Sequence, residues 1–166
     1  MEVLDYNGEG IWSKDEIARR YRQYCREMNV EASIDLSPVE DRQENVKWIY
    51  PVMFKVIEGI EKGDAVCRRI GVEFIEADGK FPFGRNIKYR TARALRRSQL
   101  TEWEKDRIRR RLVEMLISGK TTRVFKEHAR LLKKIGVGSY WDEIENGIDR
   151  SKQHIMRFYY YLKSEK

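Results

Sequence analysis

The chain has 166 residues, of which 41% are hydrophobic and 11% aromatic, and this content excludes a disordered tail because it allows a sizeable buried core. Three prolines and 11 glycines exclude collagen-like and linker-like sequences. Charged residues make up 37% and leave a net charge of +7, so we expect many solvated helical faces.

Sorting signals are missing from the two places where they would be expected. The first ten residues contain three acids and neither a basic nor an apolar stretch, unlike a secretory signal. The most apolar run, residues 46–60, is interrupted by Pro51 and several charges and is too short to span a bilayer. Cys25 and Cys67 lie far apart, which favours two reduced core thiols. We therefore expect a cytoplasmic protein that does not enter a membrane.

Capping residues predict three helices in the first half of the chain. Ser13 and Glu16 form a capping box ahead of apolar residues at helical spacing. Ser37 and Pro38 predict the start of a long second helix, in which Pro51 should introduce a kink. Asp64 predicts the start of a third helix, which should end near residue 79.

Four further helices are predicted after the turn-forming stretch 80–84. One covers residues 85–98, and the next runs from a capping box at Thr101 to Gly119. A sixth helix should begin at residue 121 or 122 and end at Gly136. The last begins at Ser139 and continues through the aromatic residues 158–161, covering 139–163.

No stretch alternates with a period of two residues for long enough to predict a strand. The prediction is therefore an all-α fold: a single domain over residues 1–166, built as a compact bundle of about seven helices. The basic motif at residues 92–97 returns 37 residues later at 129–134, so a short, solenoid-like helical-repeat array is the alternative.

Charge is distributed unevenly along the sequence. Residues 1–64 have a net charge of −5, residues 65–135 a net charge of +12, and residues 136–166 a net charge of zero. Concentrated positive charge is typical of surfaces that bind polyanions. The acidic first part could instead lie across the basic middle and neutralise it through ion pairs. The sequence leaves both interpretations open.

Helical projection separates cations from apolar residues. In the helix over residues 85–98, Ile87, Ala94 and Leu95 fall on one side, the arginines fall on the other with Tyr89, and no acid occurs. The sixth helix has a similar division, and arginines of the fifth extend the basic region. Phosphates or other anions would be bound by Arg85, Arg93, Arg96, Arg97, Arg107, Arg111, Arg123, Lys126, Arg130, Lys134 and the glycines Gly136 and Gly138, with Tyr89 stacking on a base.

The stretch LKKIGVGS at residues 132–139 resembles the hairpin of helix-hairpin-helix DNA-binding elements. The resemblance implies that Gly136, Val137, Gly138 and Ser139 let backbone amides hold a DNA phosphate without reading the sequence, with Lys134 nearby. Tyr140 and Trp141 depart from the small residues often found after such hairpins. A simpler interpretation makes Gly136 a left-handed helix cap and Ser139 the cap of the next helix.

Catalytic and metal-binding motifs are not recognised. His128 and His154 have no metal-ligand partner at a recognised spacing, and His128 lies on an apolar face, which favours a core histidine over a general base. The group formed by Glu40, Asp41 and Glu44 is interpreted as the acidic first turns of a helix. No catalytic residue, metal or cofactor is predicted.

We expect a non-enzymatic protein that binds nucleic acid through a basic helical surface without strong sequence preference. One alternative is a protein-interaction or scaffold module that docks an acidic protein partner or forms a homo-oligomer. Another is an enzyme acting on an anionic metabolite in an arginine-lined pocket, with a histidine in proton transfer.

Overall fold

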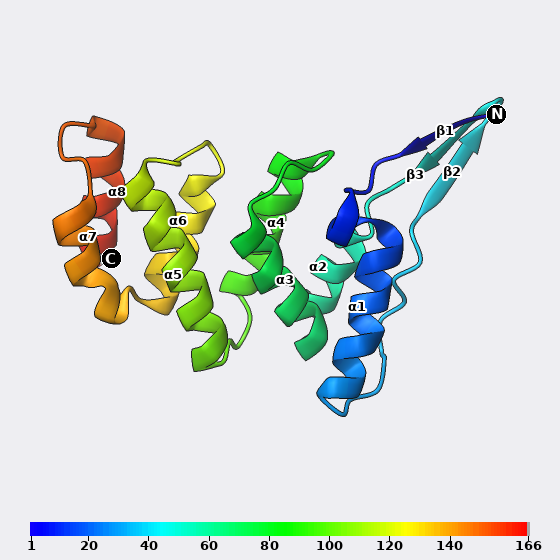
Figure 1. Cartoon of the computed structure of the whole chain (residues 1–166), viewed down its shortest axis with the longest axis horizontal. Helices are drawn as coiled ribbons and strands as arrows, with labels where there is room; N and C mark the ends of the chain where they lie inside the picture. The colour runs from blue at the N-terminus through cyan, green and yellow to red at the C-terminus, as the bar shows by residue number, and fades with distance from the viewer. Residues whose placement is uncertain (166) are drawn as a thin grey trace. The chain divides into compact units, whose positions relative to one another are not determined.

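The computed structural model describes residues 1–165 and divides the chain into two compact units, Met1–Ser98 and Gln99–Lys166 (Figure 1). We call them the N-terminal unit and the C-terminal unit. The boundary between the two units coincides with neither change in charge along the chain, and the single domain expected from the sequence stays a prediction. The predominance of helices is confirmed, but the all-α prediction is incomplete because a small sheet is present.

The N-terminal unit combines four α-helices with three short strands. Its elements are β1 (Glu2–Asp5), the 3-10 helix η1 (Gly10–Trp12), α1 (Lys14–Glu27), β2 (Glu40–Gln43), β3 (Val46–Ile49), α2 (Met53–Glu61), α3 (Ala65–Ala77) and α4 (Gly84–Arg96). The core lies among the four helices, where Ile17, Ile57, Ile70 and Leu95 are fully buried. Complete burial of each such side chain contributes roughly 1.5–3 kcal/mol.

The sheet has β3 at its centre, with β1 parallel on one side and β2 antiparallel on the other. Its strands extend away from the helices of the same unit (Figure 1). Trp48 lies between Leu4 of β1 and Asp41 of β2, which fixes the register of all three strands. β2 and β3 form a hairpin whose turn contains Glu44 at a φ of 50°.

The sheet corrects the predicted second helix. Residues 40–49 form the hairpin, so only residues 53–61 of that segment are helical, as α2. Pro51 precedes α2 and does not kink it, which agrees with the cost of placing proline inside a helix. Glu40 and Asp41 are strand residues and Glu44 lies in the turn, so they are not the acidic turns of a helix.

Three predicted helix starts are confirmed by their hydrogen bonds. The side chains of Ser13 and Asp64 accept hydrogen bonds from the amides of Glu16 and Cys67 at the starts of α1 and α3. Thr101 and Glu104 form both bonds of a capping box. This box begins α5 (Glu102–Ser118) in the C-terminal unit, and Gly119 ends that helix at a φ of 76°.

The rest of the C-terminal unit contains α6 (Phe125–Ile135), the 3-10 helix η2 (Gly138–Tyr140), α7 (Trp141–Gly147) and α8 (Gln153–Lys163). α6 begins at residue 125, later than predicted, and neither Thr121 nor Thr122 caps it. The single last helix expected over residues 139–163 is divided because Ile148 is extended and Asp149 forms a turn with the amide of Ser151. Ile108, Leu112, Phe125 and Ile155 are among the buried residues of this unit.

Candidate functional site

The predicted anion-binding residues are distributed over both units. Arg85, Tyr89, Arg93, Arg96 and Arg97 belong to α4 and its end in the N-terminal unit, whereas the other predicted residues belong to the C-terminal unit. Residues 99–166 contain 16 basic and 10 acidic residues, a net charge of +6, against +1 for residues 1–98. Each unit therefore carries its own set of predicted anion-binding residues.

The arginines of α5 are largely compensated by acids of the same helix. Arg110 lies 3.3 Å from Asp106, and Arg111 lies 3.2 Å from Glu114. The Arg107 guanidinium stacks 4.5 Å from the centre of the Trp103 ring. Arg111 and Arg107 are thus engaged within their own helix, in contrast to the free phosphate contacts expected from the sequence.

α6 carries a row of cations along one side. Lys126, Arg130 and Lys134 follow one another at intervals of four residues, which places them on one face of the helix. Lys126 and Lys134 are exposed, and within residues 1–165 neither forms an ion pair. Arg130 is half-buried and pairs with the buried carboxylate of Glu127. Arg123, which is also exposed, lies just before this helix.

The opposite side of α6 packs into the core. His128 is only 3% exposed and meets the ring of Phe125 edge-on, at 6.1 Å between ring centres. This burial fits the core interpretation of His128. Lys133 is directed toward the end of α8, where its ammonium donates a 2.7 Å hydrogen bond to the carbonyl of Tyr161. Lys133 is therefore separate from the cation row.

A turn with two glycines joins α6 to η2 and α7, and both glycines have backbone angles that other residues avoid. We call this turn, residues 136–139, the hairpin. Gly136 has a φ of 81° and a ψ of 145°, and Gly138 has a φ of 62°. Val137 between them is 4% exposed, which anchors the turn in the core. Gly136 is the C-cap residue of α6, as the simpler interpretation predicts, but its ψ lies outside the left-handed helical region, and Ser139 does not cap α7.

The Arg109 side chain of α5 donates hydrogen bonds to two backbone carbonyls at the hairpin. Its Nε donates a 2.7 Å hydrogen bond to the carbonyl of Gly136, and its Nη2 donates one of the same length to the carbonyl of Ile135. Tyr140 adds a second link, because its hydroxyl donates a 2.9 Å hydrogen bond to Asp106 of α5. Sequence reasoning missed Arg109, because its partners Ile135 and Gly136 lie 26 and 27 positions later in the chain and no local pattern links them to it.

The backbone amides of the hairpin, in contrast to these carbonyls, have no hydrogen-bond partner among the described residues. In the part of the chain that the structure describes, no acceptor takes the amide hydrogens of Gly136, Val137, Gly138 or Ser139. Gly138 and Ser139 are exposed. The hairpin thus combines carbonyls that are hydrogen-bonded to Arg109 with amides that have no acceptor among the described residues, and of these residues Gly138 and Ser139 are exposed to an external acceptor. Such a group of amides favours anions.

On α4, the predicted separation of the two sides is confirmed. Ile87, Thr91, Ala94 and Leu95 are buried, and the other side carries Arg85, Tyr89, Arg93, Arg96 and Arg97. Two further cations of this helix are engaged locally: Lys88 lies 2.8 Å from Asp78, and the Arg90 guanidinium lies 5.0 Å from the centre of the Phe54 ring.

Acids of the N-terminal unit pair mainly with cations outside this side of α4. Glu73 of α3 lies 2.9 Å from Arg20 of α1, and Glu27 of α1 lies 3.0 Å from Arg69 of α3. No acid within residues 1–165 forms an ion pair with Arg85, Arg93 or Arg97. Neutralisation by the acidic first part therefore does not extend to these three arginines.

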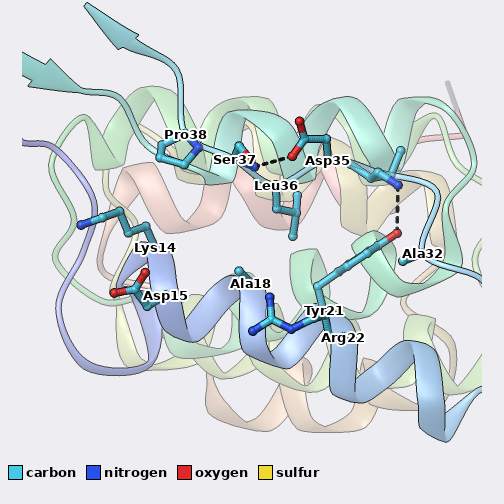
Figure 2. A pocket seen from close by; sticks show the side chains of 11 residues that line it. Lys14, Asp15, Ala18, Tyr21, Arg22, Ala32, Asp35, Leu36, Ser37 and Pro38 are labelled. Carbon is cyan, nitrogen blue, oxygen red and sulfur yellow. Dashed lines mark hydrogen bonds between the residues drawn. The ribbon is translucent and has the colours of Figure 1, made fainter.

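A groove lies between α1 and the extended segment at residues 32–38 (Figure 2). Its lining carries both signs of charge, from Lys14, Arg22, Asp15 and Asp35. The Tyr21 hydroxyl accepts a 3.3 Å hydrogen bond from the amide of Ile34 and donates a 2.9 Å hydrogen bond to Asp64. Burial and the bond to Asp64 raise the pKa of Tyr21 to about 12. Mixed charges and satisfied polar groups do not define one class of ligand for this groove.

No cluster of three or more metal-ligating side chains occurs within residues 1–165, and none of the helices there is long and apolar enough to cross a membrane. Cys25 and Cys67 are buried free thiols, and burial raises the pKa of Cys67 well above its ordinary value. No protein-family model matches the chain, and no curated protein or solved structure shows significant similarity to it.

Proposed function

We propose that the protein binds nucleic acid through the phosphate backbone, without strong sequence preference, at a surface of the C-terminal unit. This surface, which we call the α6 hairpin surface, consists of the cation row Lys126, Arg130 and Lys134 and the amides of residues 136–139. The observation that carries the proposal is the hairpin itself: its carbonyls are bonded to Arg109 while its four amides have no acceptor among the described residues.

The α6 hairpin surface offers both positive charge and hydrogen-bond donors. A phosphate needs hydrogen-bond donors and positive charge together, and backbone amides beside lysines supply both. Lys134 precedes the hairpin by two residues and Lys126 lies about two turns earlier on the same face. A strand could therefore be contacted at successive phosphates. Because amides and lysines touch phosphates and not base edges, such contacts position a nucleic acid without specifying its sequence.

The enzyme alternative lacks a comparable arrangement. His128 is buried against Phe125, and His154 is exposed on α8. Neither histidine lines the groove of Figure 2. The carboxylates of an acidic protein partner would be attracted by the same cation row and would accept from the same amides. We favour nucleic acid because its phosphates repeat at regular intervals, as the cations of the row do.

The test is a fluorescence-anisotropy titration of a labelled duplex across a salt series. The logarithm of the affinity should fall linearly with the logarithm of the salt concentration, and K126E/K134E should weaken binding and make the slope shallower by roughly one to two. The matched control is R26E/K62E, which reverses two exposed cations of the N-terminal unit. Equal losses in both double variants, or no binding at low salt, would contradict the proposal.

A further inference from the structure

The exposed side of α4 combines aromatic rings with cations in a way that the proposed function does not use. A shallow hollow at the start of the helix is lined by Phe83, Gly84, Arg85, Asn86 and Tyr89. Phe83 is 51% exposed, although phenylalanine is usually buried. Its ring packs against that of Tyr6 in a T-shaped arrangement, with 5.0 Å between ring centres and an angle of 69° between the ring planes.

The half-buried ring of Tyr89 is contacted by Arg93. The Arg93 guanidinium lies 4.4 Å from the centre of its ring and also donates a hydrogen bond to its hydroxyl. Arg93 does not line the hollow, whereas Tyr89 does. The guanidinium therefore fixes the orientation of the ring and leaves the part of Tyr89 that borders the hollow available to another flat group.

Charge on this face has a single sign. Residues 84–97 contain five arginines and one lysine and no acid. Arg85 and Arg93 lie four residues before and after Tyr89, so a cation flanks the ring on each side along the helix. Arg97 is exposed at the end of the same helix. A ligand that fits this face has negative charges at intervals and a flat ring between them.

An unpaired strand of nucleic acid has this chemistry. Its phosphates repeat along the backbone and its bases can turn out to stack on aromatic side chains, whereas the bases of a duplex are already stacked inside it. An acidic peptide would satisfy the arginines but would leave Tyr89 and Phe83 without a planar partner.

We propose that the α4 face binds single-stranded nucleic acid, with one base stacked on Tyr89 in the hollow and phosphates of the same strand on Arg85 and Arg97. This inference rests on the proposed function in taking nucleic acid as the ligand. It goes further by assigning a second contact surface and a preference for unpaired strands to the N-terminal unit.

The experiment compares the full chain with a labelled thymidine strand, an abasic strand of the same length and a duplex. The thymidine and abasic strands carry the same phosphates and differ only in the bases. Because stacking of one base on an aromatic ring is worth roughly 1–3 kcal/mol, the wild type should bind the thymidine strand about tenfold more tightly than the abasic one. Tyr89→Leu should remove this preference and leave duplex affinity unchanged.

Two variants keep the result interpretable. Tyr89→Phe retains the ring and should retain the preference for the thymidine strand. Tyr160→Leu removes a tyrosine of α8 that is 63% exposed and should have no effect on it. If Tyr89→Leu keeps the preference, or the wild type binds both strands equally, the stacking proposal is wrong, while salt-dependent duplex binding would still support the proposed function. If no probe binds, both proposals fail.

Discussion

The Arg109 guanidinium of α5 donates a 2.7 Å hydrogen bond to the carbonyl of Gly136, which lies 27 residues later in the turn after α6. A second bond of the same length reaches the adjacent carbonyl of Ile135. Through these bonds one side chain fixes the backbone orientation of the hairpin, and the amides of the turn are consequently left for an external acceptor. The proposed function therefore links the stability of the C-terminal unit to phosphate binding at Arg109.

Arg109→Ala should destabilise the protein and weaken duplex binding together. The substitution leaves two carbonyls without their charged donor, and hydrogen bonds to charged groups contribute about 1.5–3 kcal/mol each, so a loss of about 2 kcal/mol is expected in urea unfolding. The control is Arg110→Ala on the same helix, whose side chain is 71% exposed and should lose about 0.5 kcal/mol or less. Equal losses for the two variants would show that the hairpin bonds are unimportant.

Gly136→Ala should act through the backbone without changing charge. At a φ of 81° and a ψ of 145°, an alanine is strained by roughly 1–3 kcal/mol, although nothing lies within 4 Å of the added methyl group. The hairpin should therefore change conformation, and duplex affinity should fall. Gly79→Ala provides the comparison because Gly79 also lies in open space and has no positive φ. The hairpin account is wrong if Gly136→Ala binds a duplex like the wild type.

Glu73 should make a large contribution to the stability of the N-terminal unit. Its carboxylate lies 2.9 Å from Arg20 and accepts a 2.7 Å hydrogen bond from the Tyr24 hydroxyl, and the Arg20 side chain is only 9% exposed. Glu73→Ala would leave Arg20 buried without this partner, and a loss of about 3 kcal/mol is expected from chemical denaturation. Glu58→Ala, at an exposed position of α2, should change stability by less than about 0.5 kcal/mol. Similar losses in both would argue against a buried network.

The ionised carboxylate of Glu145 should make the stability of the C-terminal unit depend on pH. Hydrogen bonds from Lys163, Tyr159 and Arg150, at 2.7, 2.6 and 2.9 Å, lower its pKa to about 2. Because the folded pKa lies below the ordinary value of 4.5, this contribution is complete above about pH 4.5 and is lost as the pH falls toward about 2.

The measurement is thermal unfolding across that acidic range for the wild type and Glu145→Gln. The variant should melt at a lower temperature than the wild type at neutral pH, and the difference should shrink as the pH falls. Glu143→Gln, at an exposed position of the same helix, should follow the wild-type curve. A difference between wild type and Glu145→Gln that stays constant with pH would contradict this role.

Local signals in the sequence were sufficient for several helices. Ser13, Asp64 and Thr101 act through side chains that bond amides three residues away, so the residues that determine these helix starts are neighbours in sequence. The separation of Tyr89 and its flanking arginines from the buried side of α4 also follows from helical spacing alone.

Features that depend on distant partners could not be found in this way. β1 forms its ladder with β3, about 44 residues away, and β2 and β3 carry charged residues on strands too short to show a clear alternation. The acids at positions 40 and 41 therefore resemble the acidic first turns of a helix, although the chain forms an edge strand there. Arg109 was overlooked for the same reason, because its carbonyl partners belong to another helix end.

The proposal that the hairpin amides receive a phosphate is best tested by nuclear magnetic resonance, which follows those amides during titration with a duplex at low salt. We expect the amide signals of Gly136, Val137, Gly138 and Ser139 to shift together and to saturate with the affinity that anisotropy reports, while the amide of Gly79 stays unchanged. Duplex binding that leaves the four hairpin amides unmoved would show that they do not receive a phosphate.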